Sequence, residues 1–108
     1  MTTFTQTTLA LGQLPSSQTD ICDPSSGQTY LVHNITIFNS NTTSETVEIW
    51  KHNGTTAYQI LKATVASNET IQLEWKNSGL VVDGAHKLQG KTTTASKVTY
   101  DISGTVVV

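Results

Sequence analysis

Apolar and polar residues alternate along most of this chain, and turn-forming residues interrupt the alternation about every 8 to 15 residues. A repeat of two places successive side chains on opposite faces of a β-strand. Segment 70–75 is a clear example, because Ile71, Leu73 and Trp75 alternate with polar residues. No segment sustains the 3.6-residue repeat of an amphipathic helix. One helical turn is an alternative within residues 57–66, where Ala, Leu and Lys cluster. The pattern predicts an all-β protein.

The strongest strand pattern covers residues 28–39. Ile35 and Ile37 share one face of this expected strand. The opposite face carries a mixture of apolar and polar side chains: Val32, Asn34, Thr36 and Phe38. Apolar residues on both faces are typical of a strand inside a sheet, so we expect 28–39 to be central and largely buried.

The pair Asn53-Gly54 is the sharpest local turn signal in the chain. Such a pair suits the two positive φ angles of a type I′ turn, and alternating segments flank it on both sides. We therefore expect segments 46–52 and 55–62 to form an antiparallel hairpin.

Further short strands are expected between turns, at 19–22, 80–82, 86–91 and 96–102. This spacing is typical of a single antiparallel β-sandwich with either a jelly-roll or an immunoglobulin-like order of strands. We assign the sandwich domain to residues 17–108. Residues 1–16 are expected to form an N-terminal arm that pairs with a neighbouring subunit or, alternatively, an ordinary first edge strand.

The composition narrows the class of protein. The chain has 108 residues and a net charge of -2, with 36% hydrophobic residues, so it can bury a core and lacks the high charge of a disordered chain. Its six basic residues are all lysines, and the missing arginine argues against a nucleic-acid partner. The N-terminus lacks signal-peptide features, and no apolar run approaches the ~20 residues of a membrane helix. We expect a soluble protein that binds neither nucleic acid nor membrane.

Metal-binding and nucleophilic residues are scattered along the chain. His33, His52 and His86 stand at spacings that match no metal motif. We expect His33, on a strand face with apolar neighbours, to be a hydrogen-bonded core or interface residue. Cys22 is the single cysteine, so it can form no intrachain disulfide. No nucleophile elbow, phosphate loop or dinucleotide fingerprint occurs, and we predict no catalytic, cofactor or metal site.

Carboxylate pairs suggest one further kind of chemistry. Glu45 with Glu48, or Glu69 with Glu74, could be proposed as a glycosidase pair. Glu48 and Glu74 are expected on the outward faces of their strands, where a solvated charge is the simpler interpretation. The sequence therefore favours a non-enzymatic protein.

The alternation of apolar and polar residues predicts different environments for the two tryptophans. Trp75 continues the inward face of its strand, so we expect it in the core. Trp50 points to the outward face of its strand, whereas Val47 and Ile49 point inward. A large aromatic side chain on an outward face is typical of an interface. An alternative is a carbohydrate-binding module in which Trp50 and Tyr58, on paired strands, form a small platform.

A series of segments carries a resemblance that covers about nine-tenths of the chain. They are YLVHNI at 30–35, FN at 38–39, VEIW at 47–50, IL at 60–61, ASNETI at 66–71, GLVVDGAHKLQGK at 79–91 and ASKVTYDISG at 95–104. Together they resemble a group of small virion proteins of tailed bacteriophages, and TLALGQL at 8–14 looks like the opening of those proteins. In that group Gly more often precedes Asp where this chain has Asp83-Gly84, and both orders form turns.

The resemblance implies a β-sandwich that attaches to the capsid exterior as a homotrimer near local threefold positions and stabilises the shell. Its partners would be the major capsid protein or neighbouring virion subunits, and its location the virion, assembled in the cytoplasm of a bacterial host. A neck, tail or fibre-base component is the alternative, and no cofactor is implied. We expect the apolar residues of the arm and the outward tryptophan to contact the partner: Phe4, Leu9, Leu11, Leu14 and Trp50.

Overall fold

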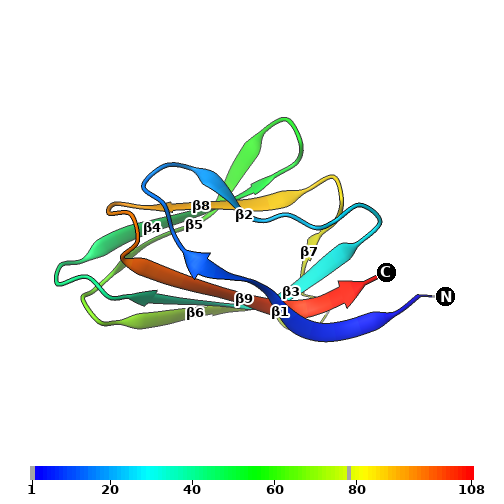
Figure 1. Ribbon diagram of the computed structural model, residues 1–108, viewed down its shortest axis with the longest axis horizontal. Helices are drawn as coiled ribbons and strands as arrows, with labels where there is room; N and C mark the ends of the chain where they lie inside the picture. The colour runs from blue at the N-terminus through cyan, green and yellow to red at the C-terminus, as the bar shows by residue number, and fades with distance from the viewer. Residues whose placement is uncertain (1, 78) are drawn as a thin grey trace.

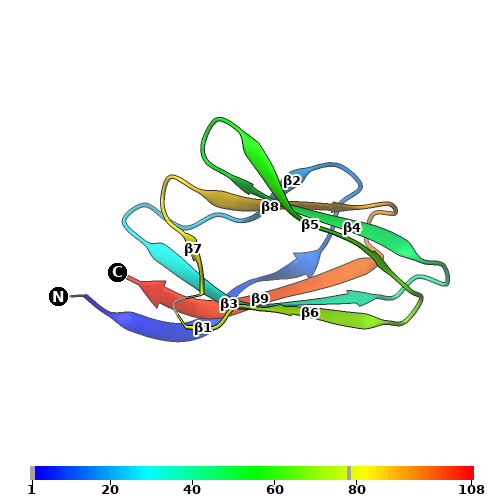
Figure 2. The ribbon, with the colours of Figure 1, turned by 180° about the vertical axis from the view of Figure 1, so that it is seen from behind.

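Nine β-strands in two antiparallel sheets make up the regular structure of residues 2–77 and 79–108, which the computed structural model describes. Sheet A has the order β1 (Phe4–Gln13), β9 (Val98–Val107), β3 (Thr29–Asn39) and β6 (Thr70–Glu74), and β7 (Leu80–Val82) also pairs with β3. Sheet B has the order β2 (Thr19–Cys22), β8 (Lys87–Thr92), β4 (Glu45–His52) and β5 (Ala57–Val65). Figures 1 and 2 show the two sheets facing each other, so the predicted all-β sandwich is confirmed.

The chain crosses repeatedly between the sheets, and the resulting order of strands decides between the two predicted topologies. If β6 and β7 are counted as one interrupted strand beside β3, each sheet has four strands in jelly-roll order. The immunoglobulin-like alternative is therefore wrong. Segment 57–65 is strand β5, so the helical turn left open in that region is also excluded. The described residues include no helix with the length and apolarity needed to cross a membrane.

The core lies between the sheets and consists of the inward half of each alternating strand. Its buried apolar side chains come from both sheets and from the residue after β1: Leu14, Ile21, Cys22, Val32, Ile35, Ile37, Val47, Ile49, Val65, Val82, Leu88, Val98 and Ile102. Each of them is at most 7% exposed. Removing this apolar surface from water is the main driving force for packing one sheet on the other.

Strand β3 is central, as predicted, with β9 on one side and β6 and β7 on the other. Its pairing with β9 shifts by one residue between Val32 and Asn34, which leaves His33 as an extra, bulged residue. A bulge changes the face on which the preceding side chains lie. Val32 is consequently buried with Ile35 and Ile37, and its predicted place on the face of Asn34 is wrong.

β4 and β5 form the predicted antiparallel hairpin, but its turn is wider than a two-residue type I′ turn. Asn53 donates its backbone N–H to the carbonyl of Thr56, and its side-chain Oδ1 accepts from the amides of Thr55 and Thr56. Gly54 has a positive φ of 94°, whereas Asn53 does not. The predicted pair of positive φ angles is therefore wrong, because the Asn53 side chain closes the turn instead.

Candidate functional site

Strand β1 occupies the edge of sheet A. It pairs with β9 along its whole length, from Phe4 opposite Val107 to Gln13 opposite Thr99. Beyond β1, the amide of Leu14 donates to a carbonyl of the same partner strand. The other side of β1 has no strand neighbour within the described residues. The N-terminal segment thus completes its own sheet on one side and offers a free edge on the other (Figure 1).

The four apolar residues predicted to contact a partner from this segment fall into two groups. Phe4 and Leu11 are 67% and 68% exposed. Leu9 lies where the register of β1 shifts and packs partly buried against the core. Leu14 is fully buried between the sheets, so its predicted contact with a partner is wrong for the folded chain. Only Phe4 and Leu11 have side chains free for such a contact.

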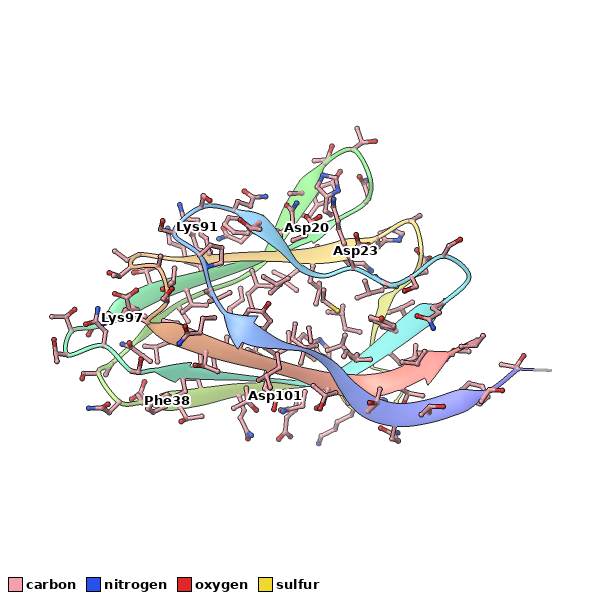
Figure 3. All side chains as sticks on the ribbon, viewed as in Figure 1. Asp20, Asp23, Phe38, Lys91, Lys97 and Asp101 are labelled. Atoms are coloured by element: carbon pink, nitrogen blue, oxygen red, sulfur yellow. The ribbon has the colours of Figure 1, made fainter. Side chains whose placement is uncertain are left out.

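The outer surface of sheet A, which we call the A face, is largely uncharged. Cross-strand pairing and exposure assign the following residues to it: Phe4, Leu11, Leu31, Thr36, Phe38, Gln72, Val81 and Asp101. Figure 3 shows Phe38 and Asp101 on the side of sheet A that points away from sheet B. The strands of sheet A contain no lysine, and their charged residues are Asp101 and Glu74. The A face therefore combines exposed apolar side chains with an acidic group.

Two side-chain oxygens near the middle of the A face lack a hydrogen-bond donor among the described residues. They are Oδ1 of Asn34 and Oδ1 of Asp101, and both are screened from solvent. The amide nitrogen of Asn34 donates to Thr36 Oγ1 at 2.8 Å, which fixes that side chain along the strand. Buried polar atoms in native proteins nearly always have a partner. These two oxygens are therefore unsatisfied acceptors that the chain itself covers.

The edge strands of the sandwich differ in how well they are protected against pairing with another chain. β2 has four residues and a register shift beside the charged Asp20. β5 has nine residues, but its pairing with β4 also shifts, and Lys62 lies within it. Short length, irregular register and charge all discourage strand addition. β1 also has a register shift, at Leu9, but it has ten residues and carries no charged residue, so it is the least protected of these three edges.

Trp50 lies half-buried on the outer surface of sheet B, which we call the B face. It is opposite Gln59 on β5 and Gln89 on β8. Tyr58 is opposite Lys51, one position along, and therefore points to the other side of the hairpin. The predicted platform of Trp50 with Tyr58 is wrong because their side chains do not share a face.

Trp75 follows the inward alternation of β6. Its side chain is partly buried and packs against the core, as predicted. Its amide donates to the carbonyl of His33 at 3.0 Å, which ties the end of β6 to the bulge of β3.

The three histidines lie in separate environments. His33 is partly buried, and its Nε2 is 3.3 Å from Thr105 Oγ1, which agrees with the predicted hydrogen-bonded role. His52 Nδ1 accepts from the amide of Gly54 at 2.9 Å in the hairpin turn. His86 Nδ1 is 2.6 Å from Asp83 Oδ1 in the turn before β8. Each imidazole is thus engaged locally, and the three are not brought together.

A shallow pocket of about 180 Å³ lies beside the His86–Asp83 pair. Its lining consists of Asp23, Gly54, Gly84, Ala85, His86 and Lys87. Hydrogen bonds from His86 and then from the Ala85 amide lower the pKa of Asp83 below its ordinary value. None of these lining residues carries a hydroxyl or thiol that the imidazole could activate as a nucleophile. The pair is best explained as a contact that fixes the turn.

Cys22 is buried in the core. Burial, followed by the nearby charge of Asp23, raises the pKa of its thiol to about 12. The thiolate is the nucleophilic form of cysteine, so Cys22 is chemically inert at neutral pH.

Glu45, which was considered above with Glu48 as a possible glycosidase pair, is 1% exposed. It accepts hydrogen bonds from Asn41 Nδ2, Thr92 Oγ1 and the amide of Thr94, at 2.7 to 3.1 Å. Burial alone would raise the pKa of Glu45, but these donors outweigh it and lower the pKa below the ordinary value. Glu48 lies on the opposite face of the same strand, so the two carboxylates cannot flank one bond of a substrate.

The other acidic pair is equally separated. Glu69 precedes β6 and Glu74 ends it, so four residues of extended chain lie between them. Across residues 2–77 and 79–108, no three His, Cys, Asp or Glu side chains converge on a position that could hold a metal ion.

Comparison with known proteins yields no family and a loose structural likeness. No protein-family model matches the chain, and no curated protein matches it. Among solved structures, a chain from the structure of infectious bursal disease virus, Gt strain, is similar over 99% of this chain, with a TM-score of 0.43 and 11% sequence identity. The present chain spans 32% of the length of that chain. A likeness this loose carries no argument about function.

Three residues of the A face escaped the sequence analysis. Phe38 was expected in a largely buried strand, yet its side of β3 is only partly covered. Val81 lies in the expected strand 80–82, was given no face there, and is 42% exposed. Asp101 could have been found, because it alternates with Tyr100 and Ile102 in the expected strand 96–102 and must lie on the face opposite to theirs.

Proposed function

We propose that this chain is a non-enzymatic structural protein of a tailed-bacteriophage virion, and specifically a capsid decoration protein that stabilises the head shell. The observation that supports a docking role most directly is the free, uncharged β1 edge, which continues into the apolar A face. The kind of partner comes from the sequence resemblance described above. The jelly-roll fold itself hosts many functions and adds only an analogy.

The proposed attachment combines two modes of recognition. The free edge of β1 pairs with an extended strand of the major capsid protein or of a neighbouring virion subunit, through backbone hydrogen bonds. Phe4 and Leu11 then contact apolar surface beside that strand, because both side chains are more than two-thirds exposed in the isolated chain. Asp101, the partly exposed acidic residue beside Leu11 on the A face, receives a polar or basic group of the partner.

The stabilising effect follows from mass action. A protein that binds only the assembled shell shifts the equilibrium toward that state by the free energy of binding. Copies bound at symmetric positions add their contributions, so modest individual contacts become collectively strong. In this proposal the protein is a homotrimer near local threefold positions of the capsid, is assembled in the bacterial cytoplasm, and needs no cofactor.

The proposal is tested with the full chain and the capsid shells encoded by the same phage genome. Shells purified with and without the protein are sedimented, and the bound copies per shell are counted by quantitative mass spectrometry. We compare the wild type with Leu11→Lys, which places a charge on the β1 edge, and with Thr64→Lys, which makes the same kind of change on the β5 edge. Deleting residues 2–14 would be a poorer test, because β1 belongs to the fold of sheet A.

The expected result is saturable binding of the wild type and of Thr64→Lys, with a strong loss for Leu11→Lys. Equal binding by all three proteins would remove β1 from the docking surface. Binding to purified necks or tails, but not to shells, would replace the decoration role by the neck, tail or fibre-base alternative. A protein that sediments with no virion component would contradict the virion proposal as a whole.

A further inference from the structure

The B face contains a row of side chains that crosses the full width of sheet B. Cross-strand pairing places Asp20 opposite Gln89, Gln89 opposite Trp50, and Trp50 opposite Gln59. Directly paired residues lie on the same face of a sheet, with Cβ atoms about 4.5–5.5 Å apart. The half-exposed indole of Trp50 is therefore bracketed on both sides by a glutamine amide.

Hydrogen bonds hold these amides in place before any ligand arrives. Gln89 donates to Asp20 Oδ1 at 2.8 Å and accepts from Gln18 Nε2 at 2.7 Å. Gln59 donates to Glu48 Oε1 at 2.9 Å. Polar side chains that are already fixed lose less conformational entropy when a ligand binds, which favours binding. The row is thus a rigid arrangement of one aromatic face between two oriented amides.

Two ion pairs engage four of the charged side chains beside the row, and Lys62, opposite Glu48 on β5, stands outside these pairs. Lys87 Nζ lies 2.9 Å from Asp20 Oδ2, and Lys91 Nζ lies 3.8 Å from Glu48 Oε2. Figure 3 shows Asp20 and Lys91 on the side of sheet B that points away from sheet A. A strongly acidic or basic ligand would find most of its counter-ions already paired on this face, so the local charge pattern favours a neutral ligand.

We propose that the row centred on Trp50 binds a neutral oligosaccharide. One face of a sugar ring consists of C–H groups, which are attracted to the electron-rich face of an indole. The hydroxyl groups at the rim of the ring are donors and acceptors, and amides flanking the indole can serve both roles. An apolar protein partner would leave these amides and carboxylates desolvated, which disfavours it as the occupant. This binding activity is independent of the virion role, because the B face and the A face lie on opposite sides of the sandwich (Figure 3).

Nuclear magnetic resonance on the full chain tests the proposal. The probes are cellohexaose, maltohexaose and chitohexaose as neutral ligands and hexagalacturonate as an acidic one. The readout is the indole N–H signal of Trp50, with that of Trp75, which packs against the core, as an internal reference. At least one neutral probe should shift the Trp50 signal in a saturable way and leave the Trp75 signal in place, while hexagalacturonate should not.

Matched variants locate the site. Trp50→Ala should weaken binding about tenfold or more, whereas Tyr58→Ala, which removes an exposed aromatic side chain outside the row, should leave it unchanged. Gln89→Ala should weaken binding several-fold, and Gln72→Ala, on the A face, should not. For these variants binding is followed by the shifts of backbone amides on β4 and β8, and the dispersion of the spectrum reports folding. If Trp50→Ala does not fold, Gln89→Ala with its Gln72→Ala control carries the test.

Several results would overturn the proposal. One is that no neutral hexasaccharide produces a saturable shift, even at concentrations well above the millimolar range. Another is that hexagalacturonate alone binds. Unchanged binding by folded Trp50→Ala, or equal losses for Gln89→Ala and Gln72→Ala, would show that the row is not the site. None of these results would alter binding to capsid shells, so this failure and that of the virion proposal can be told apart.

Discussion

The two faces of the sandwich cover one core but present different chemistry to the outside. The strands of sheet B carry Asp20, Glu48, Lys62, Lys87 and Lys91 on or near their outer surface. Four of these five side chains are joined in ion pairs or hydrogen bonds: Asp20, Glu48, Lys87 and Lys91. The outer surface of sheet A presents exposed Phe4, Leu11 and Val81, with Asp101 opposite Leu11. A pairwise-neutralised polar surface is adapted to water, whereas an apolar surface with unpartnered acceptors is adapted to being covered.

A similar contrast between buried and exposed side chains occurs within the short N-terminal segment. Leu14 and Leu11 lie three residues apart, yet the first is fully buried and the second is 68% exposed. The same segment therefore combines a core residue with a residue that is exposed and free for the proposed docking contact. Substitutions in this segment distinguish stability from docking most sharply.

Leu14→Ala should produce the largest loss of stability. It removes a buried side chain between the sheets, and truncations of this kind cost about 2–5 kcal/mol in the free energy of unfolding. Urea unfolding followed by tryptophan fluorescence measures the loss. Leu11→Ala is the matched control and should change the free energy of unfolding by about 0.5 kcal/mol or less. Equal effects of the two substitutions would mean that the segment does not divide into a buried and a docking part.

Glu45→Gln should have the next largest effect. The carboxylate is buried and accepts three hydrogen bonds, and such bonds to a charged group contribute about 1.5–3 kcal/mol each, so we expect a net loss of about 2 kcal/mol. Because the donors lower the pKa of Glu45 in the folded state, its stabilising contribution is present above the ordinary glutamate pKa. That contribution is lost as the pH falls through the lowered value.

Unfolding experiments at neutral pH and at a series of acidic pH values measure this effect. The wild type should approach the stability of Glu45→Gln as the pH falls. Glu69→Gln, which changes an exposed carboxylate, is the control and should leave the pH dependence intact. A constant difference between the wild type and Glu45→Gln at every pH would contradict the assigned role of the carboxylate.

The sequence predicted the fold class because its signals are local. Alternation in β3, β4 and β9 is a property of each strand alone, and the Asn53-Gly54 turn joins neighbours along the chain. The choice of jelly-roll order could not be predicted, because it depends on pairings such as β1 with β9 that join distant segments. The bulge at His33 was also hidden, since a register shift is visible only when two strands are placed side by side.

The candidate surfaces were predicted less completely, for a related reason. Phe4, Leu11 and Trp50 were identified because a large apolar residue on an outward or isolated position is unusual. The neighbours of Trp50 were assigned wrongly, since a register shift beside Ile49 moves Gln59, rather than Tyr58, to its side. Leu14 was placed in the arm of residues 1–16, although the core extends to that residue. Which face is covered is a property of the assembled sandwich and not of any strand.

Leu11→Lys tests the docking side directly in the isolated protein. The side chain is exposed, so the free energy of unfolding should change by about 0.5 kcal/mol or less. Solubility should rise and binding of an apolar dye should fall, because the substitution interrupts the apolar part of the A face. Thr64→Lys, on the polar side of the sandwich, should change neither property. A loss of stability above about 1 kcal/mol for Leu11→Lys would instead make Leu11 a structural cover for Asp101.

Asp20→Asn should have a small effect on stability and is the corresponding test of sheet B. Hydrogen bonds from Gln89 and then from Lys87 lower the pKa of Asp20, so its contribution is present above the ordinary aspartate pKa and is lost as the pH falls through the lowered value. The Asp20 side chain is 41% exposed, and ion pairs in such positions contribute about 0.2–1 kcal/mol or less.

A titration followed by carboxyl carbon shifts should show the pKa of Asp20 rising toward its ordinary value in Gln89→Ala. Added salt should weaken the contribution of Lys87 more than that of Gln89, because screening acts on charge–charge attraction and not on a hydrogen bond from a neutral amide. A large, salt-insensitive loss of stability in Asp20→Asn would mean that sheet B is covered rather than solvated, and the contrast between the two faces would disappear.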